Sequence, residues 1–256
     1  MLRRSRNLKP EALIRAIYRK LARSWGPQHW WPAETAFEVI AGAILTQNTS
    51  WKNVERALAS LRGANALTLE AIRALPLPRL EELVRSSGYY RQKAARLKAF
   101  VAYVDERHGG SLQEMFLAAT PQLRAELLSL HGIGPETADA VLLYAGHHEV
   151  FVVDAYARRI LLRHAVIDGS ARYDEIRALV EKALHSESPH SGVLPRVVEL
   201  APIAHAPSPM SLSPRSPHAQ VYNEMHGLLV QAGKHYCHRD NPDCERCPLR
   251  RYLPSS

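Results

Sequence analysis

The chain has no long hydrophobic run and few cysteines. None of its segments approaches the roughly 18 consecutive apolar residues of a membrane-spanning helix, so we expect no membrane contact. The basic residues 1–7 lead into no apolar stretch and do not form a secretory signal. Its 3 cysteines cannot all pair within one chain, and their clustering favours a metal over disulfides. These absences predict a cytoplasmic protein.

Strand patterns are almost absent as well. The apolar, β-branched residues 150–153 are too short to establish a sheet, whereas helical spacing recurs along most of the chain. The sequence therefore predicts an all-α fold. We expect helices at about residues 10–25, 35–47, 52–62, 68–75, 79–87, 91–107, 112–118, 121–130, 136–145, 154–165, 173–185 and 220–231.

One long segment, residues 186–218, lacks helical periodicity. It holds 7 prolines and many serines, which predicts a flexible insertion. A partner-binding role and an inert loop fit this composition equally well.

Charge of one sign is in excess. The chain has 33 Lys and Arg against 25 Asp and Glu, a formal net charge of +8, which favours an anionic partner. With 256 residues it is long enough for a full core, arranged as one large domain or two intertwined ones.

Residues 130–137 predict a phosphate-binding turn between two helices. Gly132 and Gly134 lack a Cβ, so their backbone N–H groups can approach an anion closely. Pro135 suits the first turn of the next helix, whose N-terminus favours the same anion. An ordinary helical hairpin with a glycine turn is the structural alternative.

Asp154 is the candidate catalytic residue. It follows the apolar residues 150–153 and precedes a predicted helix, so N-capping is its structural alternative. The two roles are compatible, because a helix N-terminus favours a carboxylate in its ionised form.

These segments together resemble the endonuclease III superfamily of helix–hairpin–helix (HhH-GPD) DNA glycosylases. Its motif Leu-x-Gly-[Val/Ile]-Gly-x-x-Thr-Ala matches residues 130–138, and Val-Asp follows at the family spacing as Val153-Asp154. Residues 44–49, Ile-Leu-Thr-Gln-Asn-Thr, and the cysteine run also match. The resemblance implies a six-helix domain over 34–146, packed against a second helical domain from 1–33 and 147–256, with the active-site cleft between them.

The resemblance also implies roles for single residues. Asp154 would stabilise positive charge on the deoxyribose as the base departs and would position water. Gly132, Gly134 and Thr137 would hold the DNA backbone. Gln47 would enter the duplex and fill the gap left by a flipped base. The expected partner is double-stranded DNA with a damaged base, bound by a monomer near the nucleoid.

Three aromatic or proline positions suggest which base is removed. Trp-Trp-Pro at 30–32 and an aromatic residue after Gln-Asn-Thr resemble the 3-methyladenine glycosylase branch of the superfamily. Trp31, Pro32 and Trp51 would then contact an alkylated purine by stacking and by cation–π attraction of roughly 0.5–2 kcal/mol. The structural alternative is that these tryptophans belong to the core.

Glu136 stands where lyase-competent relatives carry lysine. A glutamate has no amine to form a Schiff base with the sugar, so we expect hydrolysis without strand cleavage. One alternative is a glycosylase/abasic-site lyase that uses another amine. The other is a helix–hairpin–helix DNA-binding protein without catalysis.

Cys237, Cys244 and Cys247 follow the family's cluster spacing, but its fourth cysteine falls on Leu253. Within the predicted loop 237–253, three states remain open. The loop could hold a 4Fe-4S cluster with an incomplete ligand set, completed by His235, His238 or water. Alternatively it could hold zinc on three cysteines and one histidine, or no metal at all.

Overall fold

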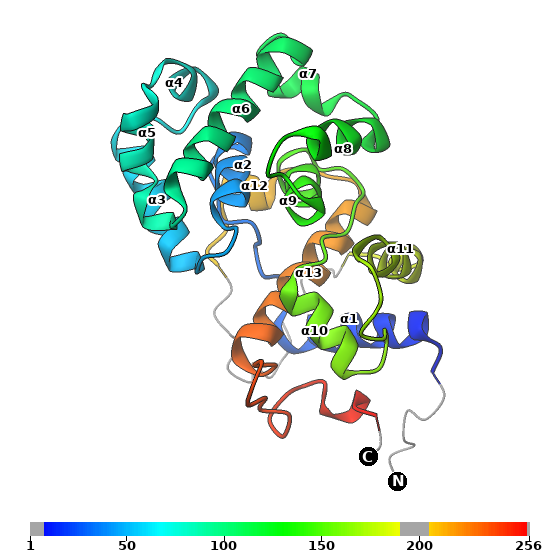
Figure 1. The fold of residues 1–256 in the computed structure, drawn as a ribbon. Helices are drawn as coiled ribbons and strands as arrows, with labels where there is room; N and C mark the ends of the chain where they lie inside the picture. Colours follow the sequence, from blue (N-terminus) through cyan, green and yellow to red (C-terminus); the bar gives the residue numbers. More distant parts are fainter. Residues whose placement is uncertain (1–7, 190–204, 255–256) are drawn as a thin grey trace. The chain divides into compact units, whose positions relative to one another are not determined.

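In the computed structural model, residues 8–189 and 205–254 are described. The chain divides into two compact units (Figure 1). The central unit comprises residues 33–148, and the split unit comprises residues 1–32 together with 149–256. The predicted all-α fold is confirmed, since the described residues form thirteen α-helices and no strand.

The central unit contains eight α-helices, and a 3-10 turn and a π-helical turn extend two of them. The α-helices are α2 (Ala36–Leu45), α3 (Trp51–Gly63), α4 (Leu69–Ala74), α5 (Leu77–Leu83), α6 (Tyr90–His108), α7 (Leu112–Phe116), α8 (Thr120–Ser129) and α9 (Pro135–Ala140). The 3-10 turn is Arg85–Ser87 and the π-helical turn is Val141–Ala145.

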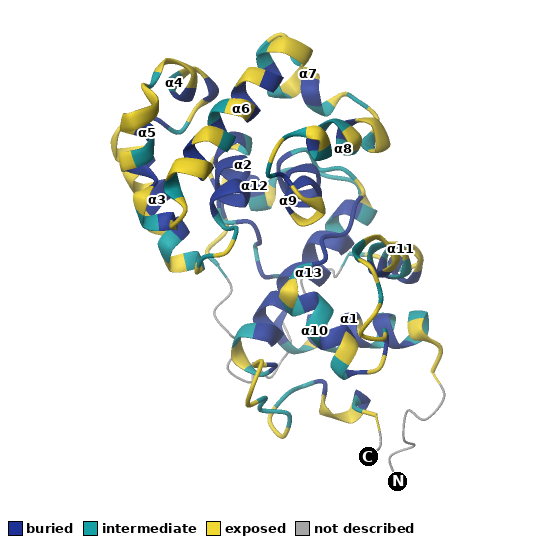
Figure 2. Cartoon of the chain, in the orientation of Figure 1, coloured by how far each residue is buried: buried dark blue, intermediate teal, exposed yellow. Residues whose placement is uncertain are grey.

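Helix α2 forms the centre of this unit. Every residue from Phe37 to Leu45 is buried, and α3, α6 and α9 all pack against the helix (Figure 2). Apart from Glu38 the helix is apolar on all sides, and such a helix is stable only when other helices cover it. The Thr35 hydroxyl accepts the Glu38 backbone N–H and begins the helix.

The C-terminal end of α2 is held by a buried lysine. Lys93, on α6, is 1% exposed, and its Nζ donates to the Leu45 carbonyl at 2.8 Å and to the Ser87 carbonyl at 2.6 Å. Leu45 ends α2, so its carbonyl has no helical partner. Burial lowers the pKa of Lys93 to about 8. Lys93 thus joins α2, α6 and the 3-10 turn at one point.

The split unit contains the remaining five α-helices and a short 3-10 turn near the C-terminus. They are α1 (Pro10–Trp25), α10 (Ala155–Arg163), α11 (Tyr173–Leu184), α12 (Pro209–Leu212), α13 (Pro217–His235) and the 3-10 turn Arg250–Tyr252. Helix α13 is buried over most of its length, and α1, α10 and α11 pack on it. Unlike α2, it buries several polar side chains: Asn223, Glu224, His226 and Gln231.

The prediction for residues 186–218 needs a correction. We expected no helix there, but Pro209–Leu212 forms α12 and Pro217 begins α13. Serines make these helices possible, because Ser208 and Ser216 accept backbone N–H groups at the two N-termini. Residues 190–204 of the predicted insertion lie outside the described residues.

Two smaller differences concern the helix ends. The helix predicted at 136–145 is α-helical only to Ala140 and continues as the π-helical turn. The helix predicted at 79–87 begins earlier, at Leu77, and its last three residues are 3-10. In the described part of the chain, no helix is long and apolar enough to span a bilayer.

The role of Lys93 can be tested by unfolding in urea. In Lys93→Met, two buried carbonyls lose their donor, and we expect the free energy of unfolding to fall by about 1–3 kcal/mol. The control is Lys98→Met on the same helix, where the bond to the Arg73 carbonyl lies at the surface. It should change stability by less than about 0.5 kcal/mol. Equal losses of unfolding free energy in the two variants would show that the buried position of Lys93 makes no special contribution to stability.

Candidate active site

The glycine turn lies between α8 and α9, as its sequence predicts. Gly132 has φ 82°, in the left-handed region, and the Ile133 N–H donates to the Leu130 carbonyl at 3.0 Å. Gly134 caps α9 with extended backbone, and Pro135 occupies the first turn. The first N–H groups of a helix have no carbonyl partner within that helix, and here they follow the glycine turn directly.

An arginine covers Gly132. A Cβ at this glycine would lie 2.1 Å from Arg96 Nε, so only glycine lets the α6 side chain pass. The Arg96 guanidinium continues to Gln47, where its Nη1 donates to Oε1. Arg96 thereby connects the turn to the segment that follows α2.

Gln47 is bonded to the same turn. Its Nε2 donates to the Gly132 carbonyl at 3.0 Å and to Thr137 Oγ1 at 2.9 Å. Because Arg96 and a carbonyl flank the amide, only one orientation of the side chain satisfies both neighbours. The structure therefore brings together Gln47, Gly132 and Thr137, three of the residues that the sequence singled out.

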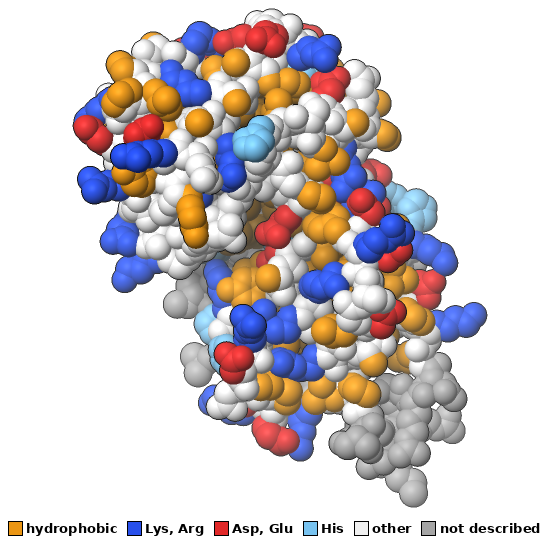
Figure 3. All heavy atoms as spheres, viewed as in Figure 1, with side chains coloured by type: hydrophobic (Ala, Val, Ile, Leu, Met, Phe, Trp, Pro, Cys, Tyr) orange, Lys and Arg blue, Asp and Glu red, His pale blue; other side chains and the backbone are white. Residues whose placement is uncertain are grey.

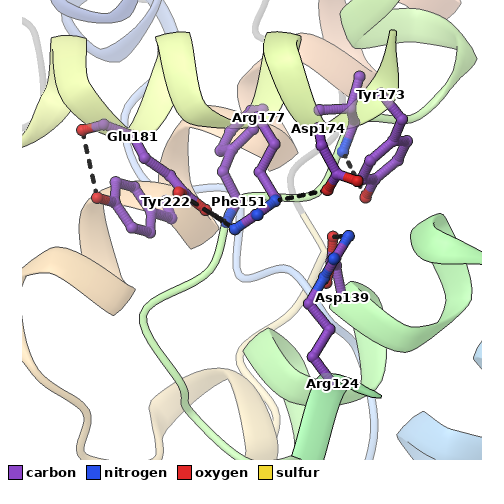
Figure 4. Close-up of polar contacts among 9 residues, drawn as sticks. Arg124, Asp139, Phe151, Tyr173, Asp174, Arg177, Glu181 and Tyr222 are labelled. Atoms are coloured by element: carbon purple, nitrogen blue, oxygen red, sulfur yellow. Dashed lines mark hydrogen bonds and ion pairs between the residues drawn. The ribbon is translucent and has the colours of Figure 1, made fainter. Parts of the chain in front are cut away.

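A partly buried ion pair connects the two helices of the hairpin. Arg124 on α8 donates from Nε to Asp139 Oδ1 at 2.7 Å and from Nη2 to Oδ2 at 3.2 Å (Figure 4). The Asp139 side chain is fully buried. Sequence analysis did not find this pair. The available clue was an aspartate between Ala138 and Ala140, on a helix that is otherwise buried there.

Asp154 is the N-cap of α10. Its Oδ1 accepts the Ala157 N–H at 2.7 Å, and its side chain is 14% exposed. The structural alternative considered for this residue is therefore present. The N-cap hydrogen bond leaves the second oxygen, Oδ2, for another partner. His226 Nε2 lies 3.6 Å from Oδ2.

The chain that leads to Asp154 is anchored by side chains of α11. Residues 150–153 are buried and belong to no helix, and they pair with no strand in the described residues. Instead, the Phe151 N–H donates to Glu181 Oε1 at 2.9 Å, and the Val153 N–H donates to the Tyr173 hydroxyl at 3.3 Å (Figure 4). Arg177 holds Glu181 from the same helix. These bonds explain how a segment of strand-like composition is satisfied without a sheet.

The three aromatic or proline candidates fall in different places. Trp31 belongs to the split unit, is buried, and packs on Trp30 with ring centroids 5.0 Å apart. The Ser208 hydroxyl donates to its carbonyl at 3.3 Å. Pro32 follows it and is half-buried. Trp51 belongs to the central unit, where it begins α3 and is half-buried.

The three cysteines line one pocket in the split unit. His164 and Leu253 also line it, whereas His235 and His238 are exposed. Burial raises the pKa of the Cys247 thiol to about 11, and the neighbouring Cys237 and Cys244 raise it further. Within the described residues, no group of three or more His, Cys, Asp or Glu side chains is placed to hold a metal ion. The residues as arranged therefore do not fit a bound metal.

The cysteine loop has other attachments. Arg159 Nε donates to the Cys237 carbonyl at 2.6 Å, and Arg163 Nη1 donates to Cys237 Sγ at 3.0 Å. Both arginines lie on α10, the helix that Asp154 begins. These two hydrogen bonds tie the loop to α10.

The fit of Arg96 over Gly132 can be tested with a neighbouring glycine as control. In Gly132→Ala, the left-handed backbone and the displaced Arg96 should lower the free energy of unfolding by roughly 2–3 kcal/mol. At Gly134, φ is not positive and a Cβ would meet nothing within 4 Å. Gly134→Ala should therefore cost less than about 1 kcal/mol, through a weaker N-cap. Unchanged stability of Gly132→Ala in urea unfolding would contradict the contact.

Comparison with known sequences identifies a matching family. The family model described as HhH-GPD superfamily base excision DNA repair protein matches residues 41–186. A presumptive DNA repair glycosylase of Methanocaldococcus jannaschii is 41% identical over 247 residues, which cover 95% of this chain and 96% of that protein.

Comparison with solved structures gives the same result. The 3-methyladenine DNA glycosylase of H. pylori, bound to 1,N6-ethenoadenine, aligns with a TM-score of 0.67 and 30% identity over 89% of this chain and 98% of that one. An endonuclease III–DNA covalent intermediate aligns with a TM-score of 0.69 and 21% identity over 96% of each chain, which supports the fold alone. These matches confirm the resemblance that the sequence indicated.

Proposed function

Because the chain belongs to the HhH-GPD superfamily of base excision DNA repair proteins, we propose that it is a monofunctional DNA glycosylase. In this proposal it hydrolyses the N-glycosidic bond of an alkylated purine in double-stranded DNA. It leaves an abasic site and does not cut the strand.

The observation that carries the proposal is the placement of Asp154. The carboxylate stands at a helix N-terminus, where a negative charge is favoured, and is partly exposed. Only one of its oxygens is used by the N-cap bond. A carboxylate held in this way can stabilise a cation that forms beside it.

In the proposed reaction, Asp154 is the only side chain that acts on the sugar and the attacking water. As the bond between C1′ and the base nitrogen lengthens, the base takes the bonding electrons and positive charge develops on the sugar. Asp154 stabilises that charge and orients a water molecule, whose oxygen bonds to C1′. The proton released by the water passes to the carboxylate or to the departing base. An alkylated purine is already electron-poor, so its departure needs little acid assistance.

The glycine turn supplies the DNA contact in this proposal. Gly132, Gly134 and Thr137 surround the N-terminus of α9, where backbone N–H groups favour a phosphate. Gln47 holds the segment after α2 beside this turn, and its neighbour Asn48 is exposed with φ 53°. We place the entry into the duplex at this Gln47–Asn48 segment.

The overall charge is consistent with DNA as the partner. The formal net charge of +8 favours a polyanion. Lys and Arg side chains occur on both units in the view of Figure 3, interspersed with Asp and Glu. The charge therefore supports attraction to DNA in general, and the glycine turn supplies the local contact.

The proposed substrate class rests on Trp31, Pro32 and Trp51. Aromatic faces attract an electron-poor or cationic base more strongly than a normal one. The similarity to the H. pylori enzyme, which is 30% identical and was solved with an etheno-modified adenine, supports an alkylated purine.

The cysteine loop has a structural role in this proposal. Since its residues do not fit a metal as arranged, no step of the reaction depends on one. A visible absorption spectrum and a metal analysis of the purified protein distinguish the three states. A brown colour with bound iron indicates an iron–sulfur cluster, bound zinc indicates a zinc site, and neither indicates that hydrogen bonds alone hold the loop.

Asp154→Asn is the direct test of the carboxylate. Asparagine also caps helices, so the fold should be kept while the charge is lost. We expect base release from methylated DNA to fall by at least about 100-fold, with the Kd for DNA nearly unchanged. The control is Asp240→Asn, the same change at a fully exposed residue, which should behave as wild type. Full activity of Asp154→Asn would remove Asp154 from the mechanism.

The absence of strand cleavage is tested with borohydride. Glu136, which takes the place of the lyase lysine, is exposed in the first turn of α9 and cannot form an imine. Borohydride should therefore trap no efficient covalent adduct with abasic DNA.

Base release by the untreated wild-type protein is then assayed on methylated, oxidised and deaminated DNA. Methylated purines should be released fastest. Efficient trapping would instead indicate a lyase that uses another amine, and preferential release of an oxidised or deaminated base would contradict the proposed substrate class.

A further inference from the structure

His226 faces the candidate catalytic carboxylate from inside the split unit. It lies on α13, is 4% exposed, and its Nε2 is 3.6 Å from Asp154 Oδ2. The reaction as described assigns no part to this histidine. Its position against the reacting carboxylate makes it the strongest candidate for a further role.

The two oxygens of Asp154 face different partners. Oδ1 accepts the Ala157 N–H at 2.7 Å, which is a full hydrogen bond. Oδ2 faces the imidazole at a distance slightly beyond one. A carboxylate held only by the hydrogen bond at Oδ1 can still rotate about that hydrogen bond. A donor to the second oxygen would fix the plane of the carboxylate.

The imidazole is itself held in orientation. The Phe151 ring meets it edge to face, with centroids 6.3 Å apart and an interplanar angle of 73°. Phe151 precedes Asp154 in the segment anchored by Glu181, so the same segment places both the carboxylate and the ring beside His226.

Burial also determines the charge of the imidazole. It lowers the pKa of His226, and the charge of Asp154 opposes this shift more weakly. Other carboxylates around α13 interact elsewhere: Glu224 with Tyr18 and Gln220, and Glu181 with Arg177. A neutral imidazole has one N–H to donate and leaves the negative charge of Asp154 intact.

We infer that His226 is a positioning residue for Asp154, whose neutral imidazole donates its Nε2–H to Oδ2. The inference rests on the proposed function for its catalytic consequence, although the contact itself does not. Catalytic hydrogen bonds are often long in the absence of substrate and shorten in the complex. The contact of 3.6 Å is expected to shorten in the same way when DNA is bound. The carboxylate would then keep one orientation toward the sugar while the base departs.

Two substitutions separate this role from simple packing. Glutamine places an amide N–H close to the position of Nε2, whereas asparagine is too short and reaches only the position of Nδ1. We expect His226→Asn to lower kcat for base release by roughly 10–100-fold, with KM within about threefold of wild type. His226→Gln should retain most of the wild-type kcat. His185→Asn, the same change at an exposed residue that ends α11 in the split unit, is the control.

The pH profile is a readout that a packing role would not change. A carboxylate that has lost a donor takes up a proton more readily. The acidic limb of kcat against pH should therefore move to higher pH in His226→Asn and stay in place in His226→Gln. Wild-type kcat and an unshifted limb in His226→Asn would overturn the inference.

A spectroscopic measurement tests the contact without activity. Nitrogen-15 NMR of the imidazole in the wild-type protein should show a neutral ring with the proton on Nε2. In Asp154→Ala, the chemical shift of that nitrogen should change. A proton on Nδ1 would overturn the inference even if His226→Asn failed to fold. If the wild-type protein released no base from any DNA, the proposed function would fail, and the NMR result would still decide the contact.

Discussion

The left-handed backbone of Gly132 is the constraint on which the hairpin depends. Because this residue has no Cβ, Arg96 can lie across it and reach Gln47. Gln47 in turn donates to the Gly132 carbonyl and to Thr137, so the turn, α6, α9 and the segment after α2 share one hydrogen-bonded cluster. A side chain at this position would separate the members of that cluster, whereas Gly134 has open space around it.

In the split unit, a comparable dependence centres on the segment before Asp154. Residues 150–153 are apolar and buried, and the N–H groups of Phe151 and Val153 need partners because no strand pairs with them in the described part of the chain. Glu181 and Tyr173 supply those partners from α11. The segment therefore enters α10 at a defined position, and the N-cap bond completes the placement of the carboxylate. Stability and the proposed chemistry use the same side chain here, which explains why the N-cap interpretation of Asp154 does not argue against catalysis.

Sequence patterns located most of the fold because local chemistry determines it. Helical spacing and helix-breaking residues placed α1, α6 and α11 within a residue or so of their observed ends. The same reasoning missed α12, whose four residues are too few to show a period and depend on the Ser208 cap. It also missed the change from α9 to a π-helical turn, since no residue type marks that change. Among residues, it missed Lys93, Arg96 and Asp139, because each has a partner 15 or more positions away in the chain: Leu45, Gln47 and Arg124.

The sequence by itself determined the all-α class, the glycine turn and the N-cap carboxylate. Each is a property of one residue or of a short spacing, which the covalent chain displays directly. Only the tertiary structure decided that Gln47 is bonded to the hairpin, that His226 faces Asp154 and that Lys93 ends α2. These are contacts between elements distant in the chain, and their distances and burial exist only once the helices have packed.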